Sequence, residues 1–222
     1  MAQDRNSSAI EPSELTFDEG RFLVRLARQA IEQYVASGIV VEPPSTTPEK
    51  LKRPGMAFVT IERYSGGGKE LRGCIGFLQP IAPLVKTVIN AAIAAATEDP
   101  RFPPLSKDEL NTIVIEVSVL SVPKLVKSID EIIIGRHGLW IYRGWRNGTL
   151  LPQVPVEYCW DRETFLAECC LKAGMDPDCW RDSKTRIYVY EGRVFYEKSP
   201  GGEIDVRDLE SEYKKRCWWL FE

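Results

Sequence analysis

The sequence contains one histidine among 222 residues, and its six cysteines include no Cys-x-x-Cys pair. Structural zinc sites are built from closely spaced cysteines and histidines, so both absences argue against such a site. The glycine run before Lys69 is not a phosphate-binding loop either, because Arg63 and Glu70 stand where that motif needs glycine and serine or threonine. We predict no metal site and no cofactor.

Long apolar segments are also missing from this chain. No uninterrupted apolar run approaches the roughly 20 residues that a membrane-spanning helix needs. The first residues, MAQDRNSSAIEPSE, lack the charged and apolar regions of an export signal. We therefore expect a soluble, cytoplasmic protein that has no membrane partner.

Neither sign of charge dominates, since the formal net charge is -3 at pH 7. Such a balance gives no general attraction to nucleic acid. The local exception is Lys214-Lys215-Arg216 beside Trp218 and Trp219, because basic residues interleaved with aromatics can bind a single strand. A docked C-terminal segment is the commoner explanation of such a tail, so we expect no nucleic-acid partner.

The cysteines are expected to be mostly free thiols, because disulfide frameworks belong to exported chains and no export signal is visible. Intracellular proteins of hyperthermophiles are an exception to this rule. A pairing among Cys159, Cys169, Cys170 and Cys179 therefore stays open at this point.

The order of the predicted elements favours an α+β fold with mainly antiparallel pairing, since it lacks the regular strand-helix alternation of a doubly wound sheet. Helices are expected from Thr16 to Gly38, after Pro83 and from Asp161 to Gly174. Strands are expected at 57–64 and 71–77, paired as a hairpin, and at 112–120, with one exposed face. A second hairpin is expected about a turn at Asn147-Gly148, and two short strands about Glu191-Gly192. We predict one compact domain of two unequal parts. A flexible arm at 1–13 precedes the main domain at 14–197, and a tail at 198–222 docks on it.

The segment ELRGCIGF places Cys74 two residues after Arg72. If the segment is extended, these two side chains share one face, and the guanidinium favours the thiolate form of the cysteine. Gly73 and Gly76 then leave room for a ligand to approach the strand. The alternative is that Cys74 is a small apolar filler, because free cysteines are among the most buried residues.

Three further residues are candidates for the same site. His137 is the only histidine, so it is the only imidazole that can form a Cys-His pair with Cys74. A surface hydrogen-bonding role is its plainer interpretation. Arg101, in DPRFPP with Asp99, can form a binding edge, although this motif also ends helices. Gln153 lies in a proline-rich run where polar side chains are usually solvated.

The hexapeptide Leu71-Arg72-Gly73-Cys74-Ile75-Gly76 resembles the signature of the AMMECR domain family. Three other stretches agree with the family in the same order: DPRFPPLSKDEL at 99–110, GRHGL at 135–139, and LLPQVPVEYCWDRETFL with KAG at 150–174. The resemblance implies a compact α+β fold of two unequal subdomains, with a cleft to which the hexapeptide contributes. It also implies Memo-like and radical-SAM proteins as partners, but no settled activity.

Three functions follow from these observations. The first is an enzyme acting on a small or anionic substrate, with Cys74 and His137 as catalytic residues and Arg72, Gly73, Gly76, Arg101 and Gln153 binding the substrate. The second is a non-catalytic module that binds a small molecule or peptide in the same cleft. The third, and weakest, is a nucleic-acid-associated regulator. Whether the protein is an enzyme at all is left open by the sequence.

Overall fold

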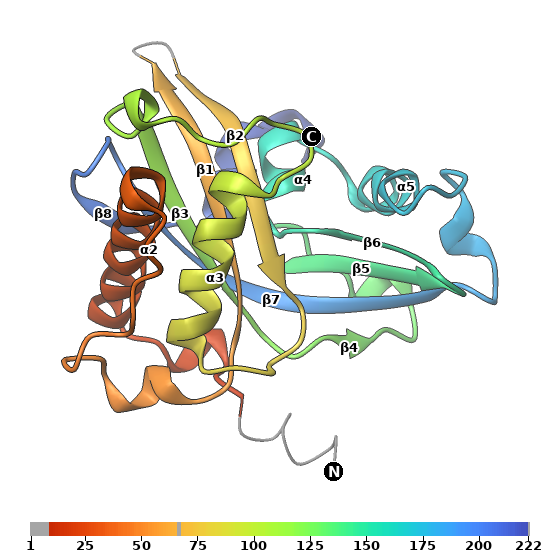
Figure 1. Cartoon of the computed structure of the whole chain (residues 1–222). Helices are drawn as coiled ribbons and strands as arrows, with labels where there is room; N and C mark the ends of the chain where they lie inside the picture. The colour runs from red at the N-terminus through yellow and green to blue at the C-terminus, as the bar shows by residue number, and fades with distance from the viewer. Residues whose placement is uncertain (1–8, 66–67, 222) are drawn as a thin grey trace. The chain divides into compact units, whose positions relative to one another are not determined.

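The computed structural model describes residues 9–65 and 68–221, which form two compact units (Figure 1). Unit 1 comprises Met1–Val122 and Arg193–Arg207, and unit 2 comprises Pro123–Gly192 and Asp208–Glu222. Residues 1–8 of the predicted arm and Gly66-Gly67 of the predicted turn lie outside the described residues. The predicted α+β class with antiparallel pairing is confirmed within each unit.

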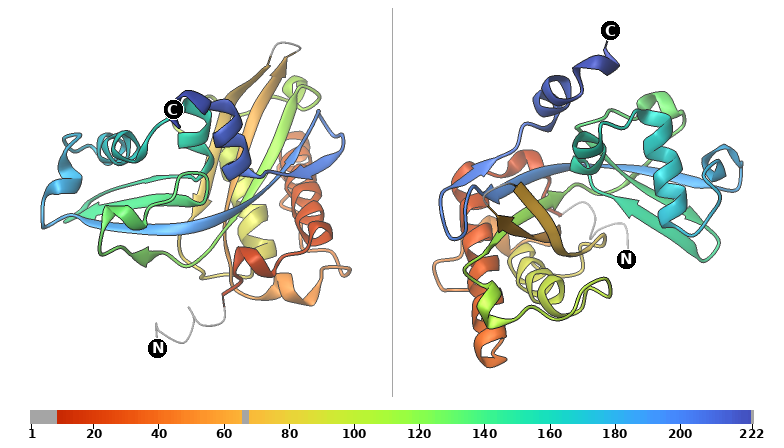
Figure 2. Two further views of the ribbon diagram at one scale, coloured as in Figure 1. Left: turned by 180° about the vertical axis from the view of Figure 1, so that it is seen from behind. Right: turned by 90° about the horizontal axis from the view of Figure 1, so that it is seen from above.

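Unit 1 is an antiparallel sheet covered on one face by two helices, α2 and α3, which also contact each other (Figures 1 and 2). Its elements are η1 (Pro12–Glu14), α2 (Phe17–Ser37), η2 (Glu49–Lys52), β1 (Met56–Ser65), β2 (Gly68–Phe77), α3 (Leu84–Thr97), η3 (Lys107–Glu109), β3 (Ile113–Leu120), the end of β7 (Arg186–Glu197) and β8 (Ile204–Val206). The strands follow the order β2-β1-β3-β7, and β8 pairs with β7. Strand β2 therefore lies at the edge of the sheet.

Local signals in the sequence set the ends of α2. Thr16 and Glu19 form a capping box at the predicted start of the helix, and Gly38 ends it in the left-handed conformation at φ 71°. Leu23 and Ile31, which belong to the apolar stripe between them, are fully buried. The exposed face predicted for β3 is wrong, because all eight of its residues are buried, Glu116 and Ser118 included.

Unit 2 is a smaller antiparallel sheet with a helix, α5, that packs on β5 and β6. Its elements are β4 (Lys124–Leu125), η4 (Ile129–Glu131), β5 (His137–Arg143), β6 (Arg146–Leu150), α4 (Gln153–Tyr158), α5 (Arg162–Lys172), η5 (Cys179–Arg181), the start of β7, α6 (Leu209–Arg216) and η6 (Trp218–Leu220). The core of this unit contains Phe165 and Leu166 of α5 packed with Leu139 and Ile141 of β5.

Two predicted turns are corrected by the structure. The β5–β6 hairpin turns at Gly144-Trp145, since Arg143 pairs with Arg146, and Asn147 lies inside β6. Gly144 supplies the positive φ that the tight turn needs, at 63°. The run 186–197 is one continuous strand, β7, because nothing at Glu191-Gly192 interrupts its extended backbone.

The cysteine prediction is also corrected, because four of the six thiols are oxidised. Cys170 pairs with Cys179, and Cys159 pairs with Cys217, a residue outside the set for which pairing had been left open. Both bridges lie in unit 2, whereas Cys74 and Cys169 are not in a disulfide.

Both ends of the described chain make ordered contacts. Ile10 is fully buried and its N–H donates to the carbonyl of Pro54, so the described part of the predicted arm is packed. In unit 2, the Tyr213 hydroxyl of α6 donates to the Trp160 carbonyl at 2.8 Å. Across residues 9–65 and 68–221, no helix combines the length and apolar character needed to span a bilayer.

Candidate functional site

Cys74 lies in the edge strand β2 and is half-buried. It is paired in register with Thr60 of β1, whose hydroxyl donates to the Cys74 sulfur at 3.3 Å. The backbone N–H of Cys74 donates to the Asp99 carboxylate, with 2.8 Å between N and Oδ2. Asp99 thus satisfies an N–H at the edge of the sheet and links the end of α3 to the cysteine.

Asp99 also binds the guanidinium of Arg101 through both carboxylate oxygens. Arg101 Nε lies 2.9 Å from Oδ1, and Nη2 lies 2.6 Å from Oδ2, the oxygen that accepts the Cys74 N–H. The Asp99 side chain is 2% exposed, whereas that of Arg101 is 48% exposed. A buried carboxylate therefore fixes a cation that solvent and ligands can still reach.

The charges of this group are set by their mutual contacts. The hydrogen bond from Arg101 lowers the pKa of Asp99 to about 2, against the opposing effect of burial. The same bond raises the pKa of Arg101, and the charge of Cys74 contributes in the same direction. Asp99 is thus a carboxylate at neutral pH, and the Arg101 charge acts on the thiol.

Arg72 is placed elsewhere because β2 contains a bulge. Gly73 pairs with Ile61 and Leu71 pairs with Glu62, so Arg72 has no opposite residue in β1. The alternation expected from the sequence breaks here, because an extra residue reverses which face the following side chains occupy. Arg72 therefore does not share the sulfur's face by simple alternation.

The Arg72 side chain is buried and its donors are occupied by protein groups. Its Nε and Nη2 lie 2.8 and 3.1 Å from the two carboxylate oxygens of Glu109, and Nη1 lies 2.9 Å from the Pro103 carbonyl. The bond from Arg72 lowers the pKa of Glu109 to about 2. Arg72 thus ties the segment after α3 to β2, and Arg101 is the guanidinium that shares Asp99 with Cys74.

The two glycines of the hexapeptide face the protein's own atoms. A Cβ on Gly73 would lie 2.1 Å from the Ala95 carbonyl oxygen of α3. A Cβ on Gly76 would lie 2.2 Å from Cγ of Phe58. Gly73 therefore allows α3 to pack on β2, and the side chain of the next residue, Cys74, points to the opposite face of the sheet.

Gly73→Ala is expected to lower the free energy of unfolding by about 3 kcal/mol, at the upper end of the usual overpacking cost. The added methyl group meets a backbone oxygen, which cannot move aside by rotating a side chain. Urea unfolding of the two proteins measures the difference. Leu71→Ala, on the same strand and 40% exposed, is the control and should cost much less. A Gly73→Ala protein as stable as the parent would contradict the close contact.

Thr60 of β1 and Glu116 of β3 lie side by side with Cys74 across the sheet. Sequence reasoning did not select these two polar residues for the site. Thr60 pairs with Glu116 of β3, whose carboxylate accepts from Arg207 Nη1 at 3.2 Å. Glu116 is buried at 6% exposure. Its signal in the sequence was a lone carboxylate inside a strand that is apolar apart from Ser118.

His137 and Gln153 belong to unit 2, whereas Cys74 belongs to unit 1. His137 is half-buried at the start of β5, and its Nδ1 accepts the Ile133 N–H at 3.1 Å. Burial lowers the pKa of His137, so the ring is neutral at neutral pH. Gln153 is buried at the first residue of α4. A Cys74–His137 pair stays a prediction.

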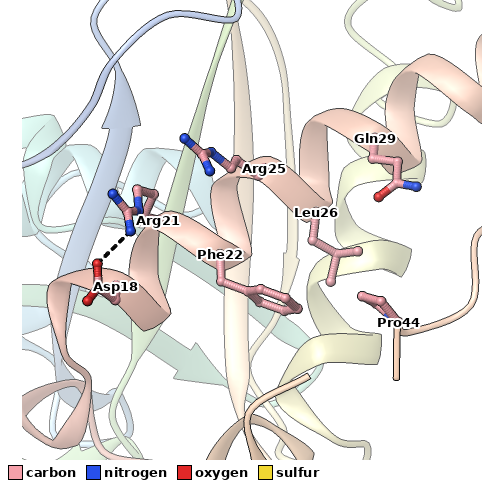
Figure 3. A pocket seen from close by; sticks show the side chains of 7 residues that line it. All are labelled: Asp18, Arg21, Phe22, Arg25, Leu26, Gln29 and Pro44. Carbon is pink, nitrogen blue, oxygen red and sulfur yellow. Dashed lines mark ion pairs between the residues drawn. The ribbon is translucent and has the colours of Figure 1, made fainter. Parts of the chain in front are cut away.

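A separate hollow lies along α2 in unit 1 (Figure 3). Phe22, Leu26 and Pro44 line it together with polar residues of α2. The dashed line in Figure 3 marks the ion pair between Arg21 and Asp18, at 2.8 Å. The residues that line this hollow include no thiol or histidine. Over the described part of the chain, no group of three or more His, Cys, Asp or Glu side chains is arranged to hold a metal.

The protein has an α+β fold in which an edge-strand cysteine lies beside an aspartate–arginine pair. The chain belongs to the AMMECR1 family, whose model matches residues 24–195. A protein of Thermococcus onnurineus is 50% identical over 196 residues, covering 86% of this chain and 96% of that protein. A Caldivirga maquilingensis protein is 48% identical and covers 89% of this chain and 94% of its own length.

A crystal structure of a related protein is similar to most of this chain. It is that of the uncharacterized protein PH0010 from Pyrococcus horikoshii, with a TM-score of 0.85 and 47% sequence identity. The match covers 87% of this chain and 98% of that one. The predicted membership of the AMMECR domain family, which was based on the hexapeptide at 71–76, is thereby confirmed for both family and fold.

Proposed function

We propose that the protein acts on a small anionic substrate through the Cys74 thiol, with Arg101 binding the anionic group. The observation that supports this most is the shared Asp99 oxygen, 2.8 Å from the Cys74 nitrogen and 2.6 Å from Arg101 Nη2. This oxygen fixes the half-exposed Arg101 guanidinium relative to the backbone of Cys74, whose thiol is half-buried. A thiolate beside a cation is the usual form of a reactive cysteine.

This proposal assigns the anion-binding role to Arg101, because the donors of Arg72 are spent on Glu109 and Pro103. The alternative is a binding module that uses the same residues without covalent chemistry. It is favoured by the Thr60 hydroxyl, which donates to the sulfur and so occupies one side of it. The two functions differ in whether the thiol itself reacts.

Alkylation of the native protein tests the role of the thiol. Iodoacetamide should label Cys74 alone, at a rate that rises with pH as the thiolate forms. Cys169 is an internal control, because burial raises its pKa to about 12. The other four cysteines are bridged. Labelling of Cys74 only after denaturation would refute a reactive thiol and leave the binding module.

A charged reagent tests the role of Arg101 separately. Iodoacetate differs from iodoacetamide mainly in its carboxylate, so a cation beside the thiol raises its relative rate. Arg101→Gln should lower the ratio of iodoacetate to iodoacetamide rates several-fold. Arg21→Gln is the matched control, since Arg21 also pairs with a neighbouring aspartate, Asp18, but lies on α2. An unchanged ratio in Arg101→Gln would show that Arg101 does not bind the anion.

A further inference from the structure

Unit 2 ends in a row of exposed apolar side chains. Trp218, Trp219, Leu220 and Phe221 are 58, 52, 42 and 57% exposed. The three residues at the end of α6, Lys214, Lys215 and Arg216, are exposed as well. We call these seven residues the C-terminal patch. Adjacent exposed apolar residues of this size mark an interaction surface more often than scattered ones do.

The C-terminal patch is held in place by the buried residues of the same segment. Leu209, Tyr213 and Cys217 form the buried side of this segment. Cys217 is bridged to Cys159, and the Tyr213 ring lies edge-on to Phe221 with 5.4 Å between centroids. The exposure of the patch is therefore a property of an anchored segment.

Cations and indoles are adjacent in the exposed part of this segment. Lys214, Lys215 and Arg216 lie in the last turn of α6, and Trp218 and Trp219 follow in η6, just after the buried Cys217. The disulfide, with 5.4 Å between its Cα atoms, also brings in the residue before Cys159, Tyr158, which is 66% exposed. The result is a basic and aromatic surface.

The acidic residues of α6 lie at its other end. Glu210 pairs with Arg136 at 2.9 Å, and Asp208 caps the helix through Ser211. Favourable interaction with the helix dipole accounts for cations in the last turn of α6. It does not account for four large apolar side chains left in water beside them.

We infer that the C-terminal patch binds the surface of an anionic lipid membrane. Tryptophan partitions into the headgroup region, and lysine and arginine pair with lipid phosphates while their stems stay in apolar surroundings. A single-stranded nucleic acid would use the rings and cations, but Leu220 offers it neither a stacking face nor a hydrogen bond. The surface of an acidic protein would pair with the cations. It would offer no apolar environment to the four exposed apolar side chains.

This proposal departs from the expectation of no membrane partner, which was based on the length of apolar runs. That criterion concerns spanning segments, whereas a surface-bound segment needs only a few inserted side chains and a set of cations. The patch uses none of the residues around Cys74, so the two proposals fail independently.

Sedimentation of the full chain with vesicles tests the inference. Vesicles of equal parts phosphatidylcholine and phosphatidylglycerol should bind the protein about a hundredfold more tightly than vesicles of pure phosphatidylcholine. This factor follows because each of the three cations should raise the affinity about fivefold. Added salt should weaken the binding. Replacing Trp218 and Trp219 by serine, or the three cations by alanine, should each weaken it about tenfold or more. Trp145→Ser, at the β5–β6 turn and 84% exposed, is the control.

The outcomes separate a membrane from a nucleic-acid partner. Vesicle binding that is lost in both patch variants and kept in Trp145→Ser supports the inference. No binding to either vesicle, or binding that the patch variants leave unchanged, overturns it. Tight binding of a single-stranded oligonucleotide that depends on the same residues, without vesicle binding, overturns it in favour of nucleic acid. Circular dichroism and thermal melting of each variant verify that the fold is kept.

Discussion

Replacing Cys159 and Cys217 together by serine is expected to lower the free energy of unfolding by about 4 kcal/mol, the chain-entropy value for a bridge across this separation. The two residues are 58 positions apart, so the bridge restricts a long stretch of the unfolded chain. It also ties α6 to the end of α4, whose connection is otherwise noncovalent. Chemical denaturation of the parent and the double variant measures the difference.

The second bridge supplies the control for this prediction. Cys170 and Cys179 are only nine positions apart, for which the same relation gives about 2.5 kcal/mol. The Cys170→Ser, Cys179→Ser protein should therefore be the more stable of the two double variants. Thiol titration of the unreduced protein in denaturant should find two thiols, Cys74 and Cys169. Six reactive thiols would show that neither bridge forms.

Glu197→Gln is expected to lower the free energy of unfolding by about 3–5 kcal/mol, the range for removing one partner of a buried ion pair. The Glu197 side chain is 3% exposed and accepts from Arg28 Nε and Nη2, both at 2.5 Å, and from the Ile115 N–H at 3.0 Å. Glutamine keeps the volume but leaves Arg28, whose side chain is 13% exposed, with only the half-exposed Glu32 as a counterion. Denaturant unfolding at neutral pH measures the loss.

Glu32→Gln is the matched control, because Glu32 also pairs with Arg28, at 3.1 Å, but is 49% exposed. Exposed ion pairs contribute about 0–1 kcal/mol, so this variant should remain close to the parent. Burial opposes the charge of Arg28, while Glu197 and then Glu32 raise its pKa. Equal effects of the two substitutions would contradict the dominant role of the buried carboxylate.

The elements that the sequence predicted well are those with local signals at both ends. The capping box of Thr16 and Glu19 and the stop at Gly38 involve contacts within a few residues, so they can be seen in the chain itself. The Asn147-Gly148 dipeptide is also a local signal, yet the hairpin turns at Gly144. Pairing of Arg143 with Arg146 determines the turn, and this depends on register, which is a property of two strands.

The candidate site shows the same division between local and distant contacts. Cys74 was found from its flanking glycines and arginine, which are neighbours in the chain. The group that holds it, Asp99, lies 25 positions away, and the bulge at Arg72 that separates the two side chains depends on the partner strand β1. Cys217 was missed as a disulfide partner for this reason, since it is 58 positions from Cys159.

Strand β7 limits how the protein can be divided into fragments. Its first half belongs to one unit and its second half to the other, and the chain passes between the units again before Asp208. A fragment that stops at Val122 would lack Glu197, the buried carboxylate that pairs with Arg28. Neither unit is therefore formed by one continuous segment of the chain. A recombination event has to transfer both units together if both are to stay intact.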